Sequence, residues 1–142
     1  MNERASAIHC EIDNPVASNH FRLEGCASSR LQAMKRPLTD NEKAALRELK
    51  EHLARDFGLV EMRLFGSRAR GEGDVESDLD VLAVLERTDW ETEKRIYDIA
   101  FDLDLKHDVV LSMIIYSRTD FDSPLNKACG FYREVQRDGV LL

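Results

Sequence analysis

Two short motifs in the middle of the chain contain residue types that bind a metal-bound triphosphate. The dipeptide Gly66-Ser67 follows an apolar run, and after ten further residues Asp78-Leu79-Asp80 opens a second apolar run. Side chains alternate along a strand, so Asp78 and Asp80 face the same way, about 7 Å apart. Neighbouring carboxylates repel each other unless a cation lies between them, and such oxygen ligands suit Mg²⁺. The paired acids therefore predict a magnesium site.

The glycine-serine turn predicts a binding site for phosphate. Backbone N–H groups at the start of a helix bind anions, and a short helix is expected directly after this turn. Two arginines of that helix, Arg68 and Arg70, either contact phosphates or are solvated at the surface. Ser77 either orients the acid that follows it or only ends the loop. Together with the paired acids, the turn predicts nucleotidyl transfer, with phosphate-binding candidates Gly66, Ser67, Arg70 and Ser77.

A third acid, Asp108, is expected to open a later strand rich in Val and Ile. If a right-handed crossover places that strand beside the strand of Asp78 and Asp80, the three acids converge. Three carboxylates can hold two Mg²⁺ ions, one on the triphosphate and one on an acceptor hydroxyl that attacks the α-phosphorus. An acid before a Val-rich strand is also a common solvated strand end, so both interpretations of Asp108 stay open.

The pattern around these motifs predicts alternating helices and strands. Thr39 and Glu42 form a capping box at the start of a helix that ends at Gly58. A last helix is expected from Ser123-Pro124 to Gly139, with Cys129 facing the core. Further elements are expected at 60–64 (strand), 68–71 (short helix), 78–85 (strand), 96–103 (helix) and 108–116 (strand). This order predicts an α/β fold with a short mixed β-sheet flanked by helices.

The organised region is expected to begin after residue 37. Residues 1–37 show no sustained periodicity, which predicts a disordered or non-native N-terminal extension, with Met34 as a possible natural start. Residues 38–142 are long enough for one domain with its own core. Among the 142 residues, 43% are hydrophobic and 33% charged, as in ordinary water-soluble domains.

Composition also limits the compartment and the partners. No apolar run approaches the length of about 20 residues that spans a bilayer, so no membrane association is expected. The three cysteines are far apart and form no C-x-x-C pair, which fits the reducing cytoplasm. The net charge of −7 argues against direct nucleic-acid binding and favours a protein or small molecule as acceptor.

The Gly-Ser turn, the Asp-x-Asp pair and a later Asp resemble the motifs of the DNA polymerase β-type nucleotidyltransferase superfamily. The closest resemblance is to its minimal nucleotidyltransferases, small proteins that are often paired with a HEPN-domain toxin as its antitoxin. It covers about residues 38–142, which would form the nucleotidyltransferase domain, and the ending from Phe131 to Leu142 also looks like the closing helix and tail of these proteins. The resemblance implies a polymerase β-type nucleotidyltransferase fold.

The resemblance further implies a catalytic role for each motif. The Gly-Ser turn would bind the triphosphate of ATP, and Asp78 and Asp80 would bind Mg²⁺. Asp108 would complete the metal site and activate the acceptor. Antitoxins of this family transfer AMP from ATP to a tyrosine of the partner toxin. Two alternatives stay open, namely a nucleotidyltransferase that acts on a small molecule such as an aminoglycoside, and an antitoxin that blocks its toxin sterically without catalysis.

Overall fold

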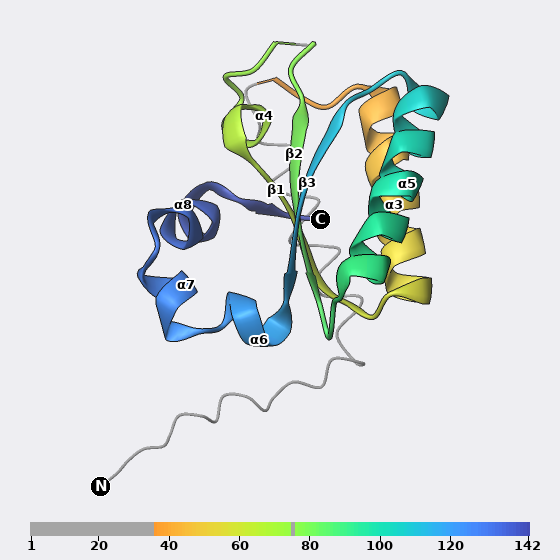
Figure 1. The fold of residues 1–142 in the computed structure, drawn as a ribbon. Coiled ribbons are helices and arrows are strands. Elements are labelled where there is room, and N and C mark those ends of the chain that lie inside the picture. Colours follow the sequence, from red (N-terminus) through yellow and green to blue (C-terminus); the bar gives the residue numbers. More distant parts are fainter. Residues whose placement is uncertain (1–35, 75) are drawn as a thin grey trace, which may run out of the picture.

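The structure, a computed structural model, describes residues 36–74 and 76–142. It has a four-stranded mixed sheet in the order β3-β2-β1-β4, with helices on both faces (Figure 1). The strands are β1 (Leu59–Phe65), β2 (Leu79–Leu85), β3 (Leu111–Ser117) and β4 (Val140–Leu141). The helices are α3 (Asp40–Asp56), α4 (Gly66–Arg70), α5 (Trp90–His107), α6 (Arg118–Phe121), α7 (Pro124–Ala128) and α8 (Gly130–Asp138). The expected short mixed sheet flanked by helices is confirmed.

The expectation of a disordered or non-native extension over residues 1–37 falls almost entirely outside the described residues, so it stays a prediction. At the border, Leu38 is buried in the core, and Arg36 donates a hydrogen bond of 3.1 Å to Asp74. Ordered packing therefore includes Leu38, where the sequence places the domain boundary. No helix in the described part of the chain is both long and apolar enough to span a membrane.

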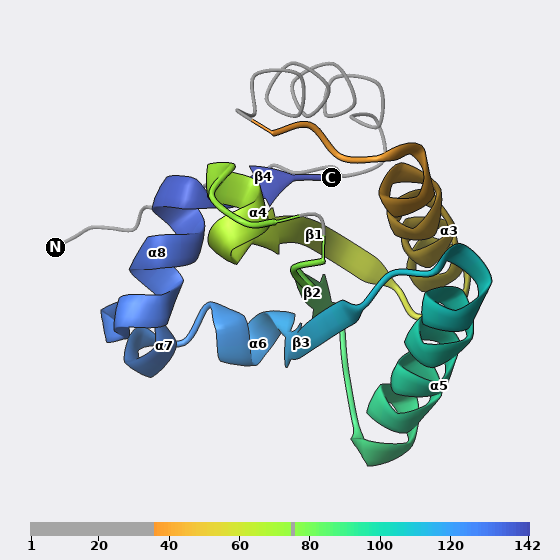
Figure 2. The same cartoon turned by 90° about the horizontal axis from the view of Figure 1, so that it is seen from above.

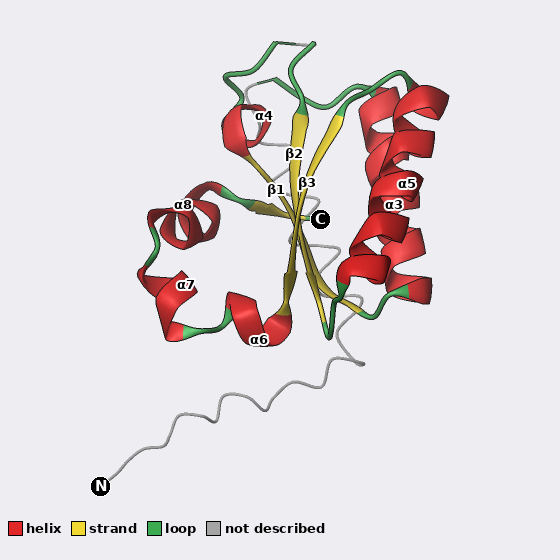
Figure 3. Ribbon diagram, viewed as in Figure 1, coloured by secondary structure: helices red, strands yellow, loops and turns green. Residues whose placement is uncertain are grey.

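The sheet separates two layers of helices. Helices α3 and α5 cover one face, and α4, α6, α7 and α8 cover the other (Figures 2 and 3). Strand β2 pairs antiparallel with β1 and parallel with β3. Its alternate residues serve two separate cores, one with Val81 and Ala83 under α3 and α5, the other with Leu82 and Val84. Because side chains alternate along a strand, Asp80 faces the same side as Leu82.

The capping box predicted at the start of α3 is confirmed. The Thr39 hydroxyl accepts a hydrogen bond from the Glu42 backbone N–H at 3.2 Å, and the Glu42 carboxylate accepts one from the Thr39 N–H at 2.6 Å. The same carboxylate also accepts hydrogen bonds from Arg68 Nε, at 3.1 Å, and from Arg68 Nη2. Both side chains are buried, Arg68 completely. Neither role expected for Arg68, phosphate contact or surface solvation, agrees with this position.

The first prediction concerns this buried ion pair. Replacing Arg68 by Met would leave the Glu42 carboxylate buried without its cation, which costs about 3–5 kcal/mol. We expect urea unfolding of Arg68→Met to show a loss of that size. Arg55→Met is the matched control, because Arg55 pairs with Asp56 at an exposed site and such pairs contribute about 1 kcal/mol or less. Equal stability losses in the two variants would contradict the structural role of the pair.

Helix α5 extends to His107, beyond the residue at which the sequence predicts its end. Strand β3 therefore begins three residues later than expected, at Leu111. Asp108 is not the first residue of a strand but the C-cap of α5, in the left-handed conformation with φ 56°. The Asp104 carboxylate then accepts a hydrogen bond from the Leu111 backbone N–H at 2.9 Å, and β3 begins there. The predicted strand start at Asp108 is therefore wrong. Asp tolerates the left-handed region better than most residues, so it can end a helix without glycine.

The last expected helix is divided in two. Cys129 has an extended backbone, φ −74° and ψ 144°, between α7 and α8. Gly130, which follows it, is a weak helix former, so nothing in the local sequence carries the helix across the break. Cys129 is exposed rather than in the core, which corrects its predicted position. The break lets Phe131 and Tyr132 of α8 pack on the second core with Phe121.

The second prediction concerns the contact between α3 and α5. Glu48 of α3 accepts a hydrogen bond from Lys106 Nζ at 2.7 Å and lies 3.0 Å from His107 Nε2. The Lys106 hydrogen bond lowers the pKa of Glu48, with His107 adding to the effect. A lowered carboxyl pKa stabilises the fold above the unfolded-state pKa, and the contribution is lost as the pH falls through the lowered value. The pair is exposed, so its effect is small and screened by salt.

We therefore expect Glu48→Gln to melt below the wild-type protein at pH 7, and we expect this difference to shrink as the pH falls below the usual carboxyl range. Melting curves at several pH values and two salt concentrations test this. Glu51→Gln, also an exposed change on α3, should show neither the difference nor its pH dependence. A difference that persists unchanged in acid would show that Glu48 acts through packing rather than charge.

Candidate functional site

The Gly-Ser turn and the Asp-x-Asp segment lie against each other. Gly66 begins α4 directly after β1, with φ +72°, a conformation that L side chains rarely adopt. Asp80 lies opposite Phe65 in the β1–β2 pair. A Cβ added at Gly66 would overlap Asp80 Oδ2 and lie 3.0 Å from Asp80 Cγ. Glycine is therefore required at position 66 both by the turn and by the approach of the carboxylate, and the two predicted motifs form one site.

The loop after α4 folds back on the turn. The Ser67 carbonyl accepts hydrogen bonds from the backbone N–H groups of Glu72, at 2.9 Å, and Gly73, at 3.2 Å. A Cβ at Gly73 would lie 2.9 Å from Ser67 Oγ, so glycine is needed for this close packing. The Ser77 hydroxyl accepts a hydrogen bond from the Asp74 N–H at 2.9 Å. Of the two roles expected for Ser77, this contact supports the one in which it closes the loop.

Asp80 is partly buried beside a second carboxylate, an environment that disfavours its negative charge and that a bound cation would stabilise. Burial raises the pKa of Asp80, and the neighbouring carboxylate of Asp78 raises it further. A hydrogen bond with Ser112 and the positive charge of Arg70 act in the opposite direction. Arg70 itself donates a hydrogen bond to Glu72 at 2.9 Å. The paired acids thus repel each other as the sequence predicts, and Arg70 supplies positive charge to this site.

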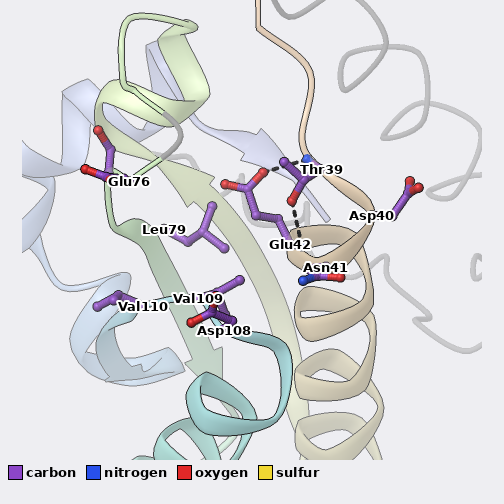
Figure 4. A pocket seen from close by; sticks show the side chains of 10 residues that line it. Thr39, Asp40, Asn41, Glu42, Glu76, Leu79, Asp108, Val109 and Val110 are labelled. Carbon is purple, nitrogen blue, oxygen red and sulfur yellow. Dashed lines mark hydrogen bonds between the residues drawn. The ribbon is translucent and has the colours of Figure 1, made fainter.

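The structure does not bring Asp108 together with Asp78 and Asp80. Asp108 ends α5, which covers the opposite face of the sheet from the one that Asp80 faces. It lines a cavity of about 640 Å³ between the start of α3 and the beginning of β2, where Figure 4 shows it beside Val109. Among the described residues, no group of three or more His, Cys, Asp and Glu side chains is placed to hold a metal ion. The predicted three-acid arrangement is therefore not formed.

Sequence reasoning did not single out Ser112, which lies beside Asp80, or Asp104 of α5, which approaches Asp78 from the opposite face of the sheet. Ser112 of β3 is the direct neighbour of Asp80 in the parallel β2–β3 register. Asp104, which holds Leu111 at the start of β3, lies near enough to Asp78 for that carboxylate to raise its pKa, after the larger effect of burial. The signal for Ser112 was the one polar position in the apolar run from Val109 to Ile115.

Comparison with known proteins agrees with this geometry. The family model described as "Nucleotidyltransferase domain" matches residues 46–130. Two curated relatives from Methanocaldococcus jannaschii are each named "Putative protein adenylyltransferase". One is 47% identical over 78 residues, which are 54% of this chain and 72% of the relative. The other is 33% identical over 104 residues, which are 72% of this chain and 98% of the relative. The chain therefore belongs to the nucleotidyltransferase domain family and is an enzyme of the nucleotidyltransferase type.

Two solved structures are also similar. A "putative nucleotidyltransferase" from Sulfolobus solfataricus is 22% identical, with 82% of this chain and 85% of that chain covered and a TM-score of 0.43. A "putative minimal nucleotidyltransferase" is 26% identical, with 84% of this chain and 95% of that chain covered and a TM-score of 0.43. The family expected from the Gly-Ser and Asp-x-Asp motifs is confirmed by the family model and the curated relatives.

The third prediction separates the two reasons for glycine at position 66. Gly58 and Gly66 both have positive φ, but a Cβ at Gly58 would meet no atom closer than 3.7 Å. Gly58→Ala should therefore lose about 1–2 kcal/mol from backbone strain alone and keep its nucleotide binding. Gly66→Ala adds the overlap with Asp80, so it should lose more stability and bind ATP with Mg²⁺ more weakly. Urea unfolding and calorimetric titration measure both effects, and equal nucleotide affinity in the two variants would contradict the assigned contact.

Proposed function

We propose that this nucleotidyltransferase transfers AMP from ATP to a hydroxyl group of a partner protein in the cytoplasm. The observation that carries the proposal is the contact between the Gly66 turn and the Asp80 carboxylate, which joins a phosphate-binding turn to a cation-binding pair. The relatives named as protein adenylyltransferases support AMP as the group and a protein as the acceptor. The net charge of −7 supports a protein acceptor over a nucleic acid.

The turn and its helix would hold the triphosphate. The N-terminal N–H groups of α4 donate to no capping side chain, because Phe65 at the N-cap has no acceptor, so these groups can donate to phosphate oxygens. Gly66 and Ser67 lie at this end of the helix, and Arg70 brings positive charge to the same side. Ser77 would contribute indirectly, because it closes the loop that packs on the turn.

Asp78 and Asp80 would hold a divalent cation, Mg²⁺. The donor set fits, because Asp78 lies directly before β2 and its carboxylate disfavours the charged form of Asp80. When bound, Mg²⁺ neutralises charge that develops on the phosphate oxygens during transfer. The reaction is an in-line displacement. The acceptor oxygen bonds to the α-phosphorus, the bond from the α-phosphorus to the bridging oxygen breaks, pyrophosphate leaves, and the hydroxyl proton passes to solvent.

The acceptor we propose is a tyrosine of a HEPN-type toxin, with this chain as its antitoxin. The support is the resemblance of the motifs to minimal nucleotidyltransferases. Transfer to a small hydroxylated molecule and steric blocking without catalysis are the two outcomes that would replace it. ATP labelled at the α-phosphorus, incubated with this chain and the toxin encoded beside it, separates the three. Label on the toxin supports the proposal, and label on a small molecule, or binding without label, supports one of the others.

The fourth prediction is that Asp80→Asn reduces this labelling at least about 100-fold, because it removes one cation ligand and its charge. The variant should fold as well as the wild type, since it also removes a repelled, half-buried carboxylate. Asp98→Asn, a change of the same kind on the exposed face of α5, is the matched control and should label normally. Full labelling by Asp80→Asn would refute the assignment of the paired acids. ATP labelled at the γ-phosphorus should give no labelled product.

A further inference from the structure

We propose that Ser112 is a positioning residue for Asp80 and that this chain's site therefore holds one divalent cation rather than two. The inference rests on the proposed function of Asp78 and Asp80. It goes beyond it by assigning a role to β3, which the sequence motifs do not cover.

The register of the sheet puts Ser112 at the site. Asp80 and Ser112 are direct partners in the parallel β2–β3 pair, so their side chains leave the sheet on the same face. Alternation along β3 supports this, because Ile114 and Tyr116 pack on the second core, on that same face. The Ser112 hydroxyl also lies near enough to the Asp80 carboxylate to act against the increase of its pKa. A hydroxyl of the neighbouring strand thus lies beside Asp80 on the same face of the sheet.

Position 112 is also where a third acid would complete a two-metal site. Two ions held about 4 Å apart need carboxylates on both sides, because each ion has several oxygen positions to fill. Asp78 and Asp80 supply two negative charges, and the neighbouring strand supplies a neutral hydroxyl in place of a third. Asp108, the other acid expected here, is the C-cap of α5, and no group of three or more His, Cys, Asp and Glu side chains among the described residues is placed to hold a metal ion. Within the described residues, the charge at the site thus matches one divalent cation with a triphosphate.

A hydrogen-bond partner behind a metal ligand affects metal affinity without contacting the metal. It fixes the orientation of the ligand, and its loss typically costs about 10-fold or more in affinity. Ser112→Ala should therefore weaken cation binding by about this factor and leave the melting temperature of the metal-free protein unchanged. Ser112→Thr keeps the hydroxyl and suits a strand, so it should restore the affinity.

The experiment counts Mn²⁺ bound in the presence of an ATP analogue that cannot be cleaved between the α- and β-phosphorus. Calorimetry or electron paramagnetic resonance gives the number of ions per chain. We expect one ion for the wild type and two for Ser112→Asp, which places a third carboxylate beside Asp80. Ser123→Asp is the matched control, with the same charge change at the N-cap of α7, where Asp is a suitable cap. It should bind one ion.

Two ions in the wild type would overturn the inference and leave the proposed function standing. Equal Mn²⁺ affinity in Ser112→Ala and the wild type, or a single ion in folded Ser112→Asp, would also overturn it. No Mn²⁺ binding by the wild type would refute the cation site and the proposed function with it. If Ser112→Asp fails to fold, the comparison of the Ala and Thr variants still decides the role of the hydroxyl.

Discussion

The buried ion pair between Arg68 and Glu42 connects the two helix layers of the fold. It joins α3 on one face of the sheet to α4, which carries the Gly66 turn, on the other. Glu42 lies in the first turn of α3, and Arg68 lies in α4, only two residues after Gly66. Both side chains are buried, so removing either one would leave the other as an unpaired buried charge and destabilise the fold. The pair therefore sets where α4 begins relative to α3. Because α4 begins at the Gly66 turn, the orientation of this turn depends on Glu42, which also caps a helix on the opposite layer.

The sheet assigns separate tasks to its two faces. One face is covered by α3 and α5, whose buried leucines and alanines make the larger core. The other face carries Asp80 and Ser112 at one end and a smaller aromatic core, with Phe121 and Tyr132, further along. This division follows from alternation, since a strand buried on both faces sends successive side chains to opposite sides. Asp108 caps a helix of the other layer, and it forms no metal-binding group with the paired acids.

Much of this arrangement could be predicted from the sequence because the signals were local. The capping box of Thr39, the paired acids of β2 and the glycine-serine turn each depend on a few neighbouring residues. The start of β3 could not be found in this way. The strand start depends on the Asp104 carboxylate, which accepts a hydrogen bond from the Leu111 N–H across a turn. It also depends on the left-handed backbone of Asp108. The buried position of Arg68 depends on Glu42, 26 residues away, and no local pattern indicates it.

The same contacts explain how a strand can carry two like charges without a bound cation. Burial and Asp78 both disfavour the charged form of Asp80, and two groups from different elements partly compensate. Ser112 acts from the neighbouring strand, and Arg70 acts through its positive charge from α4. Burial and repulsion thus disfavour the charged form of Asp80, and these two groups offset that effect only in part.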